Sequence, residues 1–224
     1  MIKLKRVSKI YRIDNKLFYA LNKISLNIAS GEMVAILGRS GAGKSTLLHI
    51  LGCLDTFEEG EYNLDGQDIG GKDLNELAHI RNEKIGFVLQ DYSLIYHKTA
   101  LFNVKAPMLF NKTPFKDMNY KALAALRCVG AIDQANKKVE NMSGGQRQRV
   151  AIARSIVNNP SIILADEPTG NLDSITSREI MNLLRELNKN GKTIIIVTHD
   201  DAIAEYCSRK IIISDGIIVN KYNQ

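Results

Sequence analysis

Residues 33–46 read MVAILGRSGAGKST, and this stretch decides the fold. Its first part, Met33–Leu37, is a continuous apolar run that is too short for a helix and is typical of a strand buried on both faces. A glycine-rich turn follows, and a helix is predicted from about Lys44 to Leu51. A strand, a glycine-rich turn and a helix in this order form an arrangement that binds phosphate with backbone N–H groups and the helix dipole.

The turn itself matches the full pattern GxxxxGK[ST]. In this pattern Lys44 reaches the β- and γ-phosphates of a nucleotide and Ser45 ligates Mg²⁺. Arg39 either contacts phosphate or is simply solvated, and we favour the solvated state. A chance glycine-rich turn is the alternative, but the flanking strand and helix argue against it. The candidate phosphate-binding residues are Gly38, Arg39, Ser40, Gly41, Ala42, Gly43, Lys44, Ser45 and Thr46.

A second motif, IILADE at residues 162–167, is an apolar strand that ends in two acids. Such a strand delivers carboxylates to the C-terminal edge of a sheet, where ligands bind in α/β folds. We expect Asp166 to hold Mg²⁺, directly or through water, and Glu167 to polarise the attacking water as a general base. The alternative is an acid pair at the start of a helix, which the accompanying phosphate loop disfavours.

A third motif, Ser143-Gly144-Gly145-Gln146, precedes a basic helix. Serine and two glycines at a helix start can form a second anion-binding site. An ordinary helix cap is the alternative, and it would be preferred if the motif stood alone.

The rest of the chain indicates an α/β protein. The alternation of Ile24, Leu26 and Ile28 with polar residues predicts a half-buried strand in the first third. A helical insertion is predicted from about Thr99 to Ala135, because strong helix formers are frequent there and no strand signal appears. Strands then alternate with helices, which implies right-handed crossovers and a mainly parallel sheet. The expected elements are strands at 85–89, 162–165, 193–198, 211–213 and 217–219 and helices at 145–157, 177–188 and 200–206.

Composition excludes several classes of protein. The chain has 224 residues, 45% of them hydrophobic and 24% charged, which is ordinary for a globular protein and not for a disordered or coiled-coil one. No apolar run spans a bilayer and the first residues lack a secretory signal, so we expect neither an integral membrane protein nor an exported one. The net charge of +6 suits an anionic ligand, but it comes without a basic run, so no nucleic-acid partner is expected. Three widely spaced cysteines make a disulfide framework or zinc site improbable.

Taken together, these motifs resemble the nucleotide-binding subunit of an ABC transporter. The phosphate loop, the SGGQ signature and the DE strand stand in the order of that family, over essentially the whole chain. The resemblance assigns Gln90 to the Q-loop, with a role in Mg²⁺ binding and coupling, and Asp173 in NLD to the D-loop. It also makes His199 the switch histidine that contacts the γ-phosphate, and Tyr11 the aromatic that stacks on adenine. Asp173 as a helix cap and Tyr11 as a packing residue are alternatives. So are Gln90 as a surface strand end and His199 as a helix N-terminal cap.

The resemblance implies a P-loop NTPase fold of the ABC type. Its core sheet is mainly parallel, with an N-terminal antiparallel β subdomain. The chain would form a single domain, 1–224, with a helical subdomain inserted at approximately 91–157. The stretches LLHILGCLD, ADEPTGNLD and RQRVAIARSIVNNP resemble the MacB/LolD-type subfamily, which serves macrolide export, lipoprotein release and antimicrobial-peptide systems.

The resemblance also implies ATP and Mg²⁺ as ligands and a function in transport. Two copies would form a head-to-tail dimer in which Ser143–Gln146 of one covers ATP on the other. The dimer would drive a separate MacB/FtsX-like permease, contacted through residues 91–140, from the cytoplasmic face of the membrane. Export or extraction of an amphipathic substrate or peptide is expected. A regulatory ATPase that gates a membrane partner without moving a solute is the main alternative, and a soluble ATPase acting on DNA or the ribosome is a weaker one.

Overall fold

The computed structural model describes residues 1–13 and 16–222 in two compact units. The first unit comprises Met1–Arg81 and Thr193–Gln224, and the second comprises Asn82–Lys192. Helix α2, Leu74–Lys84, carries the chain from one unit into the other. Across these described residues, none of the helices has the length and apolar character needed to cross a bilayer.

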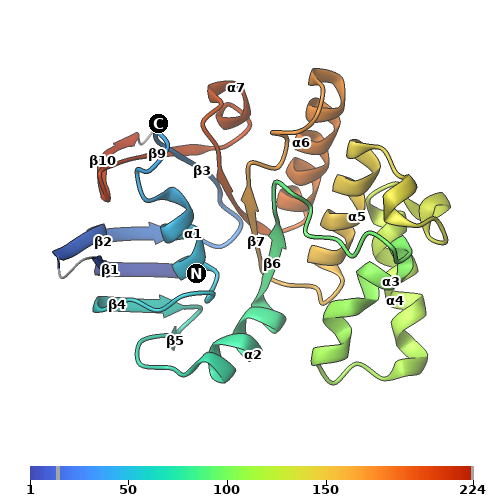
Figure 1. The fold of residues 1–224 in the computed structure, drawn as a ribbon, viewed down its shortest axis with the longest axis horizontal. Coiled ribbons are helices and arrows are strands. Elements are labelled where there is room, and N and C mark those ends of the chain that lie inside the picture. The colour runs from blue at the N-terminus through green and yellow to red at the C-terminus, as the bar shows by residue number, and fades with distance from the viewer. Residues whose placement is uncertain (14–15, 223–224) are drawn as a thin grey trace. The chain divides into compact units, whose positions relative to one another are not determined.

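An antiparallel sheet of order β2-β1-β4-β5 forms one layer of the first unit (Figure 1). Its strands are β1 Ile2–Ile13, β2 Lys16–Ile28, β4 Glu59–Leu64 and β5 Gln67–Asp68. Ile24, Leu26 and Ile28 are all buried, so the predicted half-buried strand is confirmed as the end of β2. Strands β1 and β2 form a long hairpin in which Tyr11 pairs with Phe18.

The first unit also contains the strand that precedes the phosphate loop. Strand β3, Met33–Leu37, pairs in parallel with β8, Thr193–Val197, and with β9, Arg209–Ser214. All five residues of β3 are buried, as its continuous apolar sequence predicts. Strand β10, Ile217–Tyr222, pairs antiparallel with β9. The helices of this region are α1, Lys44–Leu51, and α7, Asp201–Ala204.

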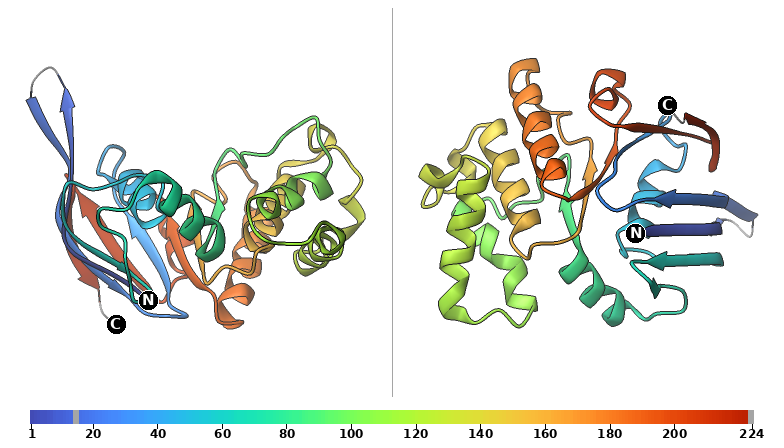
Figure 2. Two further views of the ribbon diagram at one scale, coloured as in Figure 1. Left: turned by 90° about the horizontal axis from the view of Figure 1, so that it is seen from below. Right: turned by 180° about the vertical axis from the view of Figure 1, so that it is seen from behind.

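The second unit combines a parallel strand pair with a helical cluster. Strands β6, Ile85–Val88, and β7, Ile162–Asp166, pair in parallel. Three helices pack against one another, and the last of them also contacts β6, as two further views show (Figure 2). These are α3 Ala100–Lys105, α4 Phe115–Cys128 and α5 Gly144–Ile156. The short 3-10 helices Ala106–Phe110, Ile132–Gln134 and Val139–Asn141 connect them, and α6, Ser174–Lys189, follows β7.

The α/β class and the alternation of strands and helices are therefore confirmed. Helix α1 has the predicted limits, and α5 begins and ends one residue earlier than predicted. Helix α6 begins at Ser174 rather than Ser177, because the Asp173 side chain accepts hydrogen bonds from the first-turn N–H groups of Ile175 and Thr176. Helix α2 was not predicted; only Leu77 and Ile80 of it are buried, so it carries a weak apolar pattern.

The close backbone contact between β6 and α5 should make the stability of the protein sensitive to a side chain at Gly86. A Cβ atom added to Gly86 would lie 2.3 Å from the carbonyl oxygen of Ser155 in α5. The change Gly86→Ala should therefore push the strand and the helix apart and lower the free energy of unfolding by roughly 1–3 kcal/mol. Thermal and urea unfolding of the full chain measure this loss.

The change Gly70→Ala is the matched control. Its Cβ would meet no atom nearer than the Asp68 side-chain oxygen, at 3.4 Å, so stability should change little. Equal unfolding midpoints for Gly86→Ala and the wild-type protein would contradict the backbone contact.

Candidate functional site

The phosphate loop curls around the side chain of Lys44. The Nζ atom of Lys44 donates hydrogen bonds to the carbonyl oxygens of Gly38, at 2.8 Å, and Arg39, at 2.9 Å. This holds the ammonium group against the first residues of the loop. The Arg39 side chain is exposed.

Two glycines of the loop are required by close packing, and one of them also by its backbone conformation. A Cβ atom on Gly38 would lie 2.3 Å from the carbonyl oxygen of Ile213 in β9. Gly43 has a φ of +100°, and a Cβ there would lie 2.6 Å from the carbonyl oxygen of Ala20 in β2. Only glycine allows both approaches without displacing a strand, so the loop is fixed against two strands of the first unit.

A pocket of about 240 Å³ opens beside this loop. It joins the loop to aromatic side chains of the β1–β2 hairpin, so Tyr11 lies beside the phosphate-binding residues. Its lining consists of Tyr11, Phe18, Ala20, Ser40, Gly41, Gly43, Lys44, Ser45 and Thr46. Sequence reasoning missed Phe18, because its place beside Tyr11 depends on the hairpin register.

His199 lies at the sheet edge that carries the phosphate loop. Strands β3 and β8 are parallel, with Ile36 opposite Val197, and the N–H of Thr198 donates to the carbonyl oxygen of Ile36, at 3.1 Å. The exposed His199 follows β8 just as Gly38 follows β3. The first unit thus brings together the phosphate loop, Tyr11 and the edge position of His199.

The second unit contains the two acids. Asp166 is the last residue of β7, and Glu167 follows it; both are half-buried. Glu167 has a φ of +45°, a left-handed conformation that is strained for a residue with a side chain. Its carbonyl oxygen accepts a hydrogen bond from the N–H of Gly170, at 3.1 Å, which closes a tight turn.

Gln90 lies against the segment that follows these acids. It stands two residues beyond β6, and its carbonyl oxygen accepts a hydrogen bond from Nδ2 of Asn171, at 2.9 Å. A Cβ atom on Gly170 would lie 3.0 Å from the Gln90 amide nitrogen Nε2. The second unit therefore brings Gln90 and the turn after Glu167 together.

The signature residues begin α5. The Ser143 hydroxyl accepts a hydrogen bond from the N–H of Gln146, at 3.3 Å, and the Gln146 side chain accepts one from the N–H of Ser143, at 3.1 Å. This reciprocal pair is a capping box, so within the single chain Ser143 is a helix cap. A Cβ on Gly144 would lie 3.1 Å from the Tyr92 hydroxyl, and one on Gly145 would lie 2.6 Å from a methyl group of Thr176.

Asp173 is also a helix cap within the single chain. Its carboxylate accepts hydrogen bonds from the N–H groups of Ile175 and Thr176, each at 3.0 Å, and from the Thr176 hydroxyl, at 2.6 Å. These bonds, the Thr176 hydroxyl first, hold the pKa of Asp173 below its usual value. The carboxylate is therefore charged and fixed at the start of α6.

Gln148 was not singled out in the sequence, but it joins the signature helix to the turn that follows Glu167. Its side chain is fully buried, and Nε2 donates to the carbonyl oxygen of Pro168, at 2.7 Å. A buried amide needs such a partner, so this bond fixes α5 relative to the acid-bearing turn. The one sequence signal is a polar residue two positions before the apolar run Val150–Ala153.

The donor set expected for Mg²⁺ has suitable chemistry. Ser45, Gln90 and Asp166 offer a hydroxyl, an amide oxygen and a carboxylate, which are the hard oxygen ligands that Mg²⁺ prefers. Ser45 is exposed on the first turn of α1, and Asp166 is half-buried at the end of β7.

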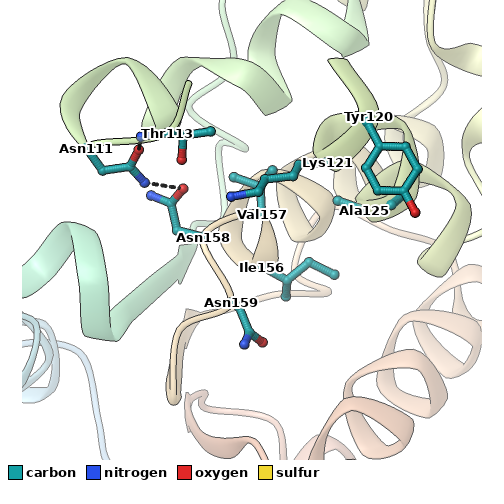
Figure 3. Close-up of a pocket in the computed structure, with 10 residues that line it drawn as sticks. Asn111, Thr113, Tyr120, Lys121, Ala125, Ile156, Val157, Asn158 and Asn159 are labelled. Carbon is teal, nitrogen blue, oxygen red and sulfur yellow. Dashed lines mark hydrogen bonds between the residues drawn. The ribbon is translucent and has the colours of Figure 1, made fainter. Parts of the chain in front are cut away.

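A second and larger pocket, of about 340 Å³, lies between α4 and the end of α5. Figure 3 shows its lining, in which Nδ2 of Asn111 donates to Oδ1 of Asn158, at 2.8 Å. Lys121 is its only charged residue, and it contains no glycine loop at a helix start. The pocket beside Lys44 is smaller, but its lining has a lysine together with the glycine loop that suits phosphate, and the pocket between α4 and α5 lacks such a loop.

Comparison with known proteins agrees with this geometry. The family described as ABC transporter matches residues 21–170. The ABC transporter ATP-binding protein YvrO of Bacillus subtilis is 48% identical over 220 residues, which cover 98% of this chain and 96% of that protein. The ATP-binding protein MJ0796 of Methanocaldococcus jannaschii is 48% identical over 96% of this chain and 94% of its own.

Two further matches concern structure and subfamily. A dimeric structure of MJ0796 in a post-hydrolysis state, bound to ADP and Pi, has a TM-score of 0.91 at 45% identity and covers 100% of this chain and 98% of that one. The macrolide export ATP-binding/permease protein MacB of Bdellovibrio bacteriovorus is 46% identical over 97% of this chain, which spans 33% of MacB. The MacB/LolD-type resemblance is thereby confirmed, and the chain belongs to the ABC transporter family as one of its ATPase cassettes.

Proposed function

We propose that this chain is the ATP-hydrolysing subunit of a transporter, and that two copies close head-to-tail around ATP to drive a separate MacB-like permease. The observation that carries the proposal is the pocket in which Tyr11 lies beside the phosphate loop. We infer export or extraction of an amphipathic substrate or peptide, and the relative MacB, which is named for macrolide export, supports the export direction.

Nucleotide binding belongs to the first unit. The loop N–H groups and the start of α1 hold the phosphates, and the Lys44 ammonium exchanges its bonds to Gly38 and Arg39 for the β- and γ-phosphates. Tyr11 stacks on the base, and His199, at the same sheet edge as the loop, contacts the γ-phosphate.

Hydrolysis uses the acids of the second unit. Glu167 accepts a proton from the attacking water, and its left-handed backbone conformation is the kind of local strain that recurs at active sites. Ser45, Gln90 and Asp166 are the residues that would hold Mg²⁺, which would supply positive charge against the phosphates. Because Gln90 lies against the turn after Glu167, a change in the position of Gln90 would shift that turn as well.

Dimerisation uses the signature and Asp173. The capping box holds Ser143–Gln146 in one conformation before any partner arrives, which lowers the entropic cost of closing on a nucleotide. Asp173, fixed at the start of α6, belongs to the same face of the second unit as Gly145, whose neighbour Thr176 it also bonds. The dimeric structure of MJ0796 supports the self-association of such cassettes.

The permease would contact residues 91–140, with the protein peripheral to the cytoplasmic membrane face. Large apolar side chains are exposed in this region, among them Phe110, at 73%, and Phe115, at 81%. Exposed apolar groups gathered in one segment are typical of a protein–protein contact.

We predict that Glu167→Gln leaves ATP binding intact but lowers turnover by about 100-fold or more, since glutamine keeps the shape of the side chain but cannot accept the proton. ATP should then hold the variant as a dimer, which size-exclusion chromatography with and without ATP detects. Turnover within about threefold of wild type would exclude the general-base role.

The signature can be tested by a pair of variants that both preserve the helix cap. Aspartate and asparagine are each good N-cap residues, so neither Ser143→Asp nor Ser143→Asn should unfold α5. Only aspartate adds a negative charge that would face the partner's γ-phosphate. We expect Ser143→Asp to bind ATP as a monomer but to lose the ATP-dependent dimer and its hydrolysis, while Ser143→Asn keeps both.

Light scattering and phosphate release on the two Ser143 variants measure these outcomes. Loss of ATP binding by the Ser143→Asp monomer would mean that the signature acts on its own nucleotide. Equal dimerisation of both variants would exclude a phosphate contact.

The permease surface is tested with a double variant. Replacing Phe110 and Phe115 by serine should leave ATPase activity of the isolated chain unchanged, because both side chains are exposed. It should reduce the amount of chain that sediments with membranes from cells making the whole transporter. Unchanged sedimentation would contradict the surface, and a partner that moves no solute would favour the regulatory alternative.

A further inference from the structure

Behind Tyr11 lies a group of charged residues that the proposed function does not use. Lys9, two positions earlier on β1, is buried, and its Nζ atom donates to Oδ1 of Asp55, at 3.0 Å, and to Oε1 of Glu58, at 3.2 Å. The Tyr11 hydroxyl donates to the other Asp55 oxygen, Oδ2, at 3.0 Å. We call Lys9, Asp55 and Glu58 the Lys9 cluster.

The cluster holds the Tyr11 ring at two points. Its hydroxyl is bonded to Asp55, and the Lys9 ammonium lies 5.1 Å from the ring centroid, within cation–π range. A tyrosine ring on a hairpin strand otherwise turns about two side-chain torsions. The ring is 38% exposed, so it keeps a surface on which a base can stack while its other contacts are fixed.

Stability alone does not account for a lysine at this place. A buried ion pair is often no more stabilising than apolar side chains of the same volume, because both charges must leave water. Burial acts to lower the pKa of Lys9, but the bonds to Asp55 and Glu58 outweigh it and raise that pKa. Burial acts to raise the pKa of Asp55, but the hydrogen bonds from Lys9, the N–H of Thr56 and the Tyr11 hydroxyl outweigh it and lower that pKa, so the pair is charged at neutral pH.

The cluster also ties the hairpin to the helix that begins at the phosphate loop. Asp55 and Glu58 lie in the segment directly after α1, where the N–H of Leu54 donates to the carbonyl oxygen of His49, at 2.8 Å. From there Oε2 of Glu58 accepts a hydrogen bond from the N–H of Ile10 in β1, at 2.7 Å. One connected set of bonds therefore runs from α1 to Tyr11.

We propose that the Lys9 cluster is a positioning element that fixes the Tyr11 ring relative to the phosphate loop. The distance between the surface on which the base stacks and the loop that binds the phosphates then stays constant. This inference rests on the proposed role of Tyr11 as the base-stacking residue. Lys9 touches no nucleotide itself, and it acts only through Tyr11.

The test separates base binding from phosphate binding. Isothermal titration calorimetry on the full chain gives the dissociation constants of ATP and of inorganic tripolyphosphate, which has no base. We expect Lys9→Met to weaken ATP binding about two- to tenfold, the equivalent of ordering one side chain on binding. Tripolyphosphate binding should stay unchanged, because the phosphate loop is untouched.

The Lys9→Met variant should still fold, although it leaves the carboxylates of Asp55 and Glu58 without their lysine partner. The Asp55 and Glu58 side chains are 33% and 39% exposed, so water can solvate both when Lys9 is replaced. The matched control is Lys5→Met on the same strand, which removes the exposed Lys5–Glu61 pair and should alter neither affinity. Tyr11→Phe, which keeps the ring but loses the bond to Asp55, should weaken ATP binding in the same selective way.

A double-mutant cycle decides the mechanism. If Lys9 acts only through Tyr11, then Lys9→Met should cost no further ATP affinity in a Tyr11→Ala background. Additive losses, equal losses for ATP and tripolyphosphate, or unchanged ATP affinity in Lys9→Met would each overturn the positioning role. If instead Tyr11→Ala binds ATP as tightly as wild type, the base site itself is wrong, which is a separate failure of the proposed function.

Discussion

The close approach of the phosphate loop to its two neighbouring strands is the constraint on which the first unit depends. At Gly38 the loop lies against β9, and at Gly43 it lies against β2, at separations that leave no room for a Cβ atom. Strand β3, buried on both faces, fixes where the loop begins. Because β2 belongs to the hairpin that carries Tyr11, this packing also decides that an aromatic ring lies beside the glycine-rich loop.

The second unit uses the same kind of backbone contact for a different purpose. Gly86 lets α5 pack directly on β6, and the buried Gln148 joins α5 to the turn after Glu167. The signature, the Q-loop and the acid-bearing turn are thus parts of one packed body. Ser143 and Asp173, which the resemblance assigns to the signature and the D-loop, already have hydrogen-bond partners in the single chain, so their conformations are fixed before any second subunit could bind.

Residue types at fixed spacing could be interpreted from the sequence because their chemistry is local. The strand, turn and helix of residues 33–51 are specified by neighbouring residues, and the structure reproduces the predicted limits of α1. A local pattern does not distinguish a helix cap from a ligand-binding residue. Ser143 and Asp173 fit both roles, so the sequence left both alternatives open. Helix α2 was missed because only Leu77 and Ile80 contribute to its buried face.

The sequence by itself determined the α/β class, the order of motifs and the residues able to bind phosphate, since each depends on short-range spacing. The tertiary structure alone decided which residues distant in the sequence lie in contact. The place of Phe18 opposite Tyr11, the Lys9 cluster and the bond from Gln148 to Pro168 join residues between 7 and 49 positions apart. Such pairings depend on strand register and on burial against distant segments, which no local pattern encodes.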